Sequence, residues 1–196
     1  VTDVLYLSGN TLKNVTISPE TGITTSTYRP TAVPATDVNK DGIMEIPKAA
    51  LLPGYTEKDA RYRIEWNTIS AAGELKMVLN TYHNYSEEWF FVLPGSWLKR
   101  VTITANTVYG VNNTIFEYVT ENDRRVPILR LYNYTGSDEE QPISADAIEL
   151  GRTSVVYLAQ LYDTKEIPED LRISEKSLTD RFSLISKDWF SEEYLP

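Results

Sequence analysis

The sequence predicts a mainly β protein with minor α structure, an α+β fold in which antiparallel sheets dominate. Short runs rich in Val, Ile, Thr and Tyr recur along the chain, and Asn, Asp, Gly or Pro turns separate them, as is typical of antiparallel strands. One helical spacing of apolar residues occurs near the C-terminus. The chain has 196 residues and an ordinary globular balance, with 41% hydrophobic and 24% charged residues. We therefore expect it to fold around a packed core.

The first lobe is expected over residues 1–83 as a blade-like antiparallel β lobe. Its first two strands flank a Gly-containing turn at 8–10, which predicts a hairpin. A third, short strand is expected to end at Pro47, because proline cannot donate to a strand ladder. The last two strands alternate apolar and polar residues across a turn that contains Gly73. The expected strands are residues 4–7, 12–17, 43–46, 62–66 and 75–82.

The second lobe is expected over residues 84–196 as an α+β domain, an antiparallel sheet with a C-terminal helix. The boundary is placed where a polar stretch at 83–88 precedes an apolar run. Ser174 resembles a helix N-cap, and Leu178, Phe182 and Ile185 then follow at a spacing that puts them on one helical face. The expected strands of this lobe are residues 101–107, 114–119, 127–134 and 154–162.

Composition and charge exclude several classes of function. The chain has no cysteine, so disulfides, thiolate metal sites and cysteine nucleophiles are ruled out. Its formal net charge of −9 opposes binding to nucleic acid, and no apolar run reaches the length of a transmembrane segment. Abundant Thr, Asn and Tyr suit a bacterial protein that is secreted or belongs to the cell envelope. Because the sequence starts at Val1 with no signal-like segment, we expect any export signal to have been removed or to lie outside it.

The strongest local motif is a nine-residue loop at 37–45, with the sequence DVNKDGIME. Side chains that carry oxygen occupy positions 1, 3, 5 and 9, and Gly at position 6 permits a sharp turn. Alternate side chains of a tight loop converge on one point, and calcium prefers six to eight such hard oxygen ligands. The spacing predicts a structural Ca²⁺ site. Its candidate ligands are Asp37, Asn39, Asp41, the carbonyl of Ile43, and Glu45.

This loop is not expected to be an EF-hand. An EF-hand needs a bidentate acid at position 12, which is Lys48 here, and it needs helices on both sides. The exit at residues 43–46 resembles a strand instead. An alternative stays open: a metal-free turn whose Asp and Asn side chains accept hydrogen bonds from the backbone of the loop itself.

Residues 37–47, DVNKDGIMEIP, resemble the calcium loop of FG-GAP or VCBS repeats. These repeats form β-propeller blades in extracellular and cell-envelope proteins. The resemblance extends over residues 1–80 and implies that the five loop residues named above hold the ion. A propeller needs about four blades, whereas this chain has material for one or two. The resemblance thus implies either a C-terminal piece of a longer propeller protein or a blade-like lobe that rests on something else.

Residues 89–190 are similar to an uncharacterised C-terminal domain of Firmicutes envelope proteins. The similarity lies in the segment FFVLPGSW at 90–97 and in ELGRT at 149–153, which leads to Tyr157. It implies an antiparallel sheet with a helix and no established activity.

The motifs for common enzyme classes are missing from the sequence. The chain has one histidine, His83, and no Gly-x-Ser-x-Gly or P-loop signature. The sequence therefore favours a non-catalytic module that acts in adhesion or protein interaction, with calcium as a structural ion. The alternative is a protein that binds or hydrolyses surface glycans with exposed Trp, Tyr and carboxylates. The partner would then be another protein or a glycan, and the sequence does not specify the oligomeric state.

Overall fold

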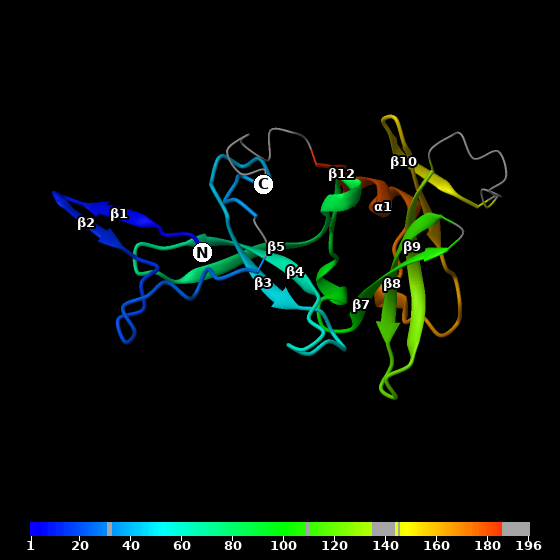
Figure 1. The fold of residues 1–196 in the computed structure, drawn as a ribbon, viewed down its shortest axis with the longest axis horizontal. Coiled ribbons are helices and arrows are strands. Elements are labelled where there is room, and N and C mark those ends of the chain that lie inside the picture. Colours follow the sequence, from blue (N-terminus) through cyan, green and yellow to red (C-terminus); the bar gives the residue numbers. More distant parts are fainter. Residues whose placement is uncertain (31–32, 109, 135–143, 145, 186–196) are drawn as a thin grey trace.

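The computed structural model describes residues 1–30, 33–108, 110–134, 144 and 146–185. These residues form two five-stranded antiparallel sheets, a separate two-stranded hairpin and one short α-helix (Figure 1). The expected mainly β fold with minor α structure is confirmed. None of the helices in these ranges is long and apolar enough to cross a membrane.

The first sheet has the strand order β12-β6-β5-β4-β3. Its two longest strands join at the expected turn. There Gly73 has a φ of 85°, and the Gly73 N–H donates to the carbonyl of Ser70. Neighbouring strands pair with Ile64 opposite Thr81 and Thr81 opposite Val92. The strands of this sheet are β3 (Ile46–Leu51), β4 (Tyr62–Ile69), β5 (Leu75–Asn84), β6 (Trp89–Val92) and β12 (Phe182–Leu184).

The second sheet has the strand order β10-β11-β9-β8-β7. Each of the four strands predicted here from Val, Ile, Thr and Tyr content is present. The sequence analysis did not predict its edge strand β10. The strands are β7 (Val101–Val108), β8 (Val111–Val119), β9 (Arg125–Tyr134), β10 (Ile148–Arg152) and β11 (Val156–Leu161).

One hydrophobic cluster joins the two sheets. Phe91 of β6 packs against Phe116 of β8 with ring centroids 5.2 Å apart, and Trp97 lies 5.6 Å from the same Phe116 ring. All three side chains are almost completely buried. The Trp97 indole N–H donates to the carbonyl of Leu171 at 2.9 Å, so its polar atom is satisfied inside the core. Burying such large rings removes much apolar surface from water and so stabilises the fold.

The expected boundary between residues 83 and 84 falls inside β5, and β5 pairs directly with β6 beyond it. The hydrophobic cluster also includes Leu52 and Tyr82 from the first lobe. The first sheet is thus continuous across that position. The division into domains 1–83 and 84–196 stays a prediction.

Two local expectations are wrong. Pro47 does not end a strand at residue 46: β3 begins at Ile46 and runs through Pro47 to Leu51. A proline is tolerated there because β3 is the edge strand of its sheet, where only alternate N–H groups bond a neighbouring strand. Residues 48–51 therefore belong to this strand.

The C-terminal helix is also shorter than expected. Ser174 caps α1 (Glu175–Arg181) as predicted, with its hydroxyl oxygen accepting from the N–H of Ser177 at 3.2 Å. However, the helix ends before Phe182, which begins β12 and pairs with Phe91. Strand pairing with a buried partner overrides the helical spacing of the local sequence. Leu178 alone of the three expected residues is a buried helix residue.

The hairpin of β1 (Leu5–Ser8) and β2 (Thr11–Asn14) projects away from both sheets (Figure 1). Its two-residue turn is Gly9-Asn10, with Gly9 at a φ of 58°. We call residues 1–30 the arm. The β4–β5 turn packs against the arm so closely that a Cβ added to Gly73 would lie 2.4 Å from the carbonyl oxygen of Val15. This contact holds the arm against the end of the first sheet.

Candidate functional site

The 37–45 loop connects the arm to the first sheet. The backbones of Thr36 and Glu45 exchange hydrogen bonds of 3.1 and 2.9 Å, which close the loop at its base. Lys40 and Gly42 have positive φ values of 61° and 88°, as a tight reversal requires. The loop leads directly into β3 at Ile46, and no helix flanks it among the described residues. The conformation of residues 37–45 therefore matches the predicted nine-residue loop that leads into a strand.

The first three candidate ligands accept hydrogen bonds from the backbone of the loop. The carboxylate of Asp37 accepts from the N–H groups of Asp41 at 3.0 Å and Gly42 at 2.8 Å. Asn39 Oδ1 accepts from Asp41 N–H at 3.0 Å, and Asp41 Oδ1 accepts from Ile43 N–H at 2.8 Å. Asn39 Nδ2 donates to Asp41 Oδ2 at 2.8 Å. The loop thus makes the side-chain hydrogen bonds of the metal-free alternative.

Glu45 differs from the other candidate ligands because its side chain is completely buried. Its Oε2 accepts from the N–H of Val38 at 3.0 Å. Its Oε1 is buried and has no hydrogen-bond partner among the described residues. A buried carboxylate oxygen without a donor or a cation costs free energy. Sequence spacing named Glu45 as a candidate ligand, whereas its burial was not foreseen.

The loop meets the chemistry of a calcium site in part. Asp37, Asn39, Asp41 and Glu45 supply hard oxygen atoms, and a carboxylate oxygen that accepts one hydrogen bond keeps a second lone pair. The unpartnered Oε1 of Glu45 is a position that a cation would satisfy. However, no group of three or more His, Cys, Asp or Glu residues in the described ranges lies close enough together to hold a metal ion. Binding would therefore require the loop carboxylates to move toward one another.

His83 lies in an aromatic environment on the first sheet. Its ring stacks on Phe90 with centroids 5.4 Å apart and on Tyr85 at 5.3 Å. Its Nε2 lies 2.7 Å from Oγ1 of Thr81, which also accepts from the indole N–H of Trp66 at 2.8 Å. Burial lowers the pKa of His83 to about 3. The imidazole is thus neutral near pH 7 and packs, partly buried, against neighbouring aromatic rings.

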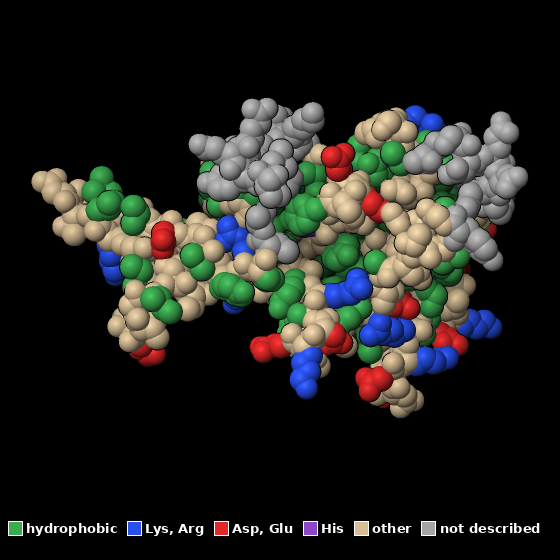
Figure 2. All heavy atoms as spheres, viewed as in Figure 1, with side chains coloured by type: hydrophobic (Ala, Val, Ile, Leu, Met, Phe, Trp, Pro, Cys, Tyr) green, Lys and Arg blue, Asp and Glu red, His purple; other side chains and the backbone are tan. Residues whose placement is uncertain are grey.

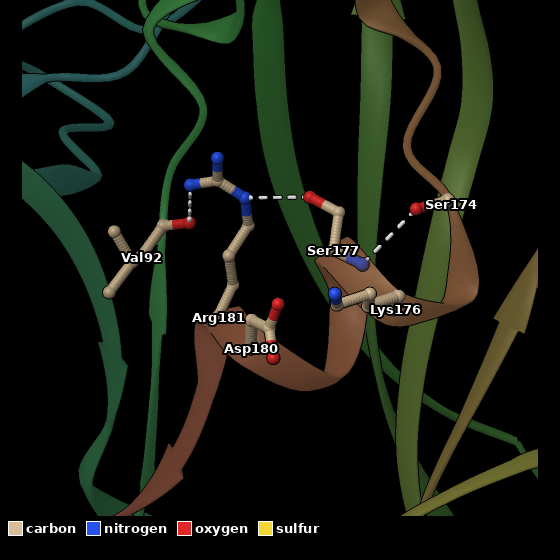
Figure 3. A pocket seen from close by; sticks show the side chains of 6 residues that line it. All are labelled: Val92, Ser174, Lys176, Ser177, Asp180 and Arg181. Carbon is tan, nitrogen blue, oxygen red and sulfur yellow. Dashed lines mark hydrogen bonds between the residues drawn. The ribbon is translucent and has the colours of Figure 1, made fainter.

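A hollow of about 400 Å³ lies between α1 and the end of β6. Figure 3 shows Arg181 reaching from the helix toward the strand, where its Nε donates to Ser177 Oγ at 3.2 Å and its Nη1 donates to the Val92 carbonyl at 3.3 Å. These contacts tie α1 to β6. The hollow shares no residue with the 37–45 loop. Its lining residues are Val92, Ser174, Lys176, Ser177, Asp180 and Arg181.

The three tryptophans within the described residues offer little surface for stacking on a glycan. Trp66, Trp89 and Trp97 are at most 2% exposed, and Trp189 lies outside the described residues. Glu87, one of the carboxylates next to Trp89, is also buried and accepts the Trp89 indole N–H at 3.0 Å. Adjacent acidic residues in the polar stretch at 83–88 predict a solvated linker, and this prediction is wrong for Glu87, whose side chain is buried. Its role here is to satisfy a buried indole.

The arm carries a surface that the sequence analysis did not single out. Figure 2 shows hydrophobic side chains along the projecting hairpin. Leu5, Leu7 and Leu12 are 58%, 64% and 60% exposed. Leu7 pairs with Leu12, and alternate residues of a strand share a face, so the three leucines lie on one face of the hairpin. The signal in the sequence was the i, i+2 spacing of Leu5 and Leu7 across the turn from Leu12.

No protein-family model matches this chain, and neither a curated protein nor a solved structure was found to be similar to it. The resemblance of residues 37–47 to FG-GAP or VCBS calcium loops therefore stays a prediction. The same holds for the similarity of residues 89–190 to a domain of Firmicutes envelope proteins.

Proposed function

We propose that this chain is a non-catalytic, calcium-stabilised interaction module of a secreted or cell-envelope protein. The observation that carries the proposal is the buried Oε1 of Glu45, which lacks a partner among the described residues at the base of a loop with calcium-ligand spacing. Asp37, Asn39, Asp41 and the carbonyl of Ile43 would complete the ligand set.

The ion would have a structural role at this position. Glu45 directly precedes β3, whereas Asp37 lies at the end of the segment that leads from the arm. A cation that binds both residues would fasten that segment to the edge of the first sheet. Extracellular modules bind calcium with dissociation constants of about 10⁻⁴ to 10⁻³ M, which suits a secreted or cell-envelope setting.

The proposal is tested by thermal unfolding of the wild-type chain in excess Ca²⁺ and in chelator. A ligand that binds only the folded state at about 100 times its dissociation constant stabilises that state by about 2.7 kcal/mol. For a chain of this size we expect Tm to rise by about 5–10 °C. The rise should be lost in Asp41→Ala, which removes one ligand.

The matched control is Glu121→Ala, which removes one exposed carboxylate from a turn in the second sheet. It should keep the full calcium response, and calorimetric titration should give one site in both the wild type and this control. If wild-type Tm is the same in calcium and in chelator and no heat of binding is measured, the loop is a metal-free turn and the calcium proposal is wrong.

A further inference from the structure

We propose that a cation bound in the 37–45 loop controls how firmly the arm is held against the first sheet, so that the loop and the arm together form a calcium-dependent conformational device. This inference rests on the proposed function, because it names what ion binding at that same site regulates. Its own basis is a path of contacts that runs from Glu45 to Thr2 at the beginning of the arm.

The path begins at the buried carboxylate of Glu45. Its Oε2 accepts from the N–H of Val38 at 3.0 Å, so the start of the loop is fastened to the residue that precedes β3. The Val38 side chain packs against a small buried cluster that is separate from the core between the two sheets. The residues of this cluster are Val33, Ile64 and Trp66, of which the last two belong to β4. The segment from Val33 to Val38 therefore packs on the first sheet.

Arg29 continues the path into the arm. Its Nε donates to the carbonyl of Val33 at 2.6 Å, and its Nη1 donates to Oγ1 of Thr2 at 3.0 Å and to the carbonyl of Thr27 at 3.1 Å. Thr27 is fully buried, and its hydroxyl oxygen accepts from the N–H of Thr2 at 2.9 Å and donates to the Thr2 carbonyl at 2.8 Å. One half-buried guanidinium thus joins the segment on the sheet to both ends of the arm.

The arm should open more readily than the two sheets. Its strands β1 and β2 pair with each other, and none of its described residues belongs to either hydrophobic cluster. A two-stranded hairpin is only marginally stable by itself, and regions with few buried apolar contacts open at a low free-energy cost. An opening of the arm must either break the bond from Arg29 to Val33 or pull Val33 and Val38 away from the sheet.

A bound ion opposes the second kind of opening. Asp37 and Asn39 move with the segment that leaves the sheet, whereas Glu45 stays at the start of β3. An ion that needs ligands from both sides binds only the closed state, and at about 100 times its dissociation constant it lowers the open population about 100-fold. The arm is then held in the orientation of Figure 1 when calcium is abundant, and it opens more often when calcium is removed.

Hydrogen exchange of single amides, measured by NMR in excess Ca²⁺ and in chelator, tests this path. Two amides report on its two ends: the N–H of Val38, which donates to Glu45, and the N–H of Thr2, which donates to Thr27. We expect calcium to slow exchange at Val38 by up to about 100-fold. At Thr2 we expect a slowing of about 10-fold, because fraying of the first residues adds openings that the ion does not affect.

The variant Arg29→Gln interrupts the path and leaves every candidate ligand in place. It removes the guanidinium that bonds both Val33 and Thr2. Calorimetric titration should show unchanged Ca²⁺ binding, and calcium should still slow exchange at Val38 but no longer at Thr2. The matched control is Arg152→Gln, which removes an exposed guanidinium that pairs with Glu149 in the second sheet. It should respond to calcium as the wild type does at both amides.

The outcomes separate this inference from the proposed function. If titration shows Ca²⁺ binding and Val38 exchanges more slowly, but exchange at wild-type Thr2 is the same with and without calcium, the coupling to the arm is wrong and the calcium site stands. A calcium response at Thr2 that Arg29→Gln keeps in full, or that Arg152→Gln also loses, would equally overturn the path through Arg29. If titration shows no binding and neither amide responds, the proposed function itself fails.

Discussion

The stability of this protein should depend on the protonation of a single histidine, His83. It is the one histidine of the chain, so it is the only side chain whose ordinary pKa lies between 5 and 8. Its ring stacks on Phe90 and on Tyr85, and its Nδ1 is shielded from solvent. A charge on this ring would have to be desolvated in the folded state. Acidification should therefore favour unfolding before the carboxylates of the chain begin to titrate.

The size of the effect follows from the two pKa values. Burial lowers the pKa of His83 from 6.5 to about 3, so the folded ring stays neutral where the unfolded ring is already protonated. Unfolding then takes up a proton, and the free energy of unfolding is highest above pH 6.5 and falls as the pH drops toward 3. The pKa difference corresponds to about 2 kcal/mol at about pH 5. Because the ring keeps part of its surface exposed, we expect a loss of about 1–2 kcal/mol.

The measurement is urea unfolding of the wild type and of His83→Phe at about pH 8 and about pH 5. Phenylalanine keeps an aromatic ring against Phe90 and cannot titrate, although it loses the contact with Thr81 Oγ1. The variant should be somewhat less stable at the higher pH and should lose little further stability at the lower one. Equal losses in the two proteins would refute the reasoning, because the pH dependence would then come from other groups.

Two further predictions concern packing. Gly73→Ala should lower the free energy of unfolding by about 2 kcal/mol or more, because the backbone φ is 85° and the new Cβ would lie 2.4 Å from the Val15 carbonyl oxygen. The control Gly110→Ala, at a φ of 79° with no atom within 4 Å of the new Cβ, should lower it by only about 1 kcal/mol. Equal losses in urea unfolding would contradict the contact between the arm and the β4–β5 turn. Leu178→Ala should cost about 2–5 kcal/mol in the same measurement because the side chain is fully buried, and a loss below about 1 kcal/mol would show that α1 is not part of the core.

Most strands were predictable because their signals are local. Alternating residues at 62–66 and the Gly73 turn predict the β4–β5 pair without any knowledge of its partner strands. Phe182 shows where that reasoning fails. Its spacing from Leu178 is helical, but its pairing partner Phe91 lies far away in the sequence, and the pairing decides its conformation. Pro47 fails for a related reason, since only the order of strands shows that it occupies an edge.

The candidate site also has features that the local sequence predicts and features that only distant contacts decide. The spacing of Asp37, Asn39 and Asp41 around Gly42 is a local property, and the tight loop is present as the sequence predicts. The burial of Glu45, and the lack of a partner for its Oε1 within the described part of the chain, depend on the segments that pack around them, which a nine-residue motif does not encode.

The sequence by itself determined the fold class, the hairpins and the tight, oxygen-rich loop at 37–45. These features depend on residue periodicity and turn chemistry over ten or twenty positions. Only the tertiary structure decided that the two sheets share one core, that His83 packs against aromatic rings, and that the leucines of the arm face solvent. The physical reason is that burial depends on which distant segments meet. A leucine in an alternating strand has the same local pattern whether a second layer covers it or water does.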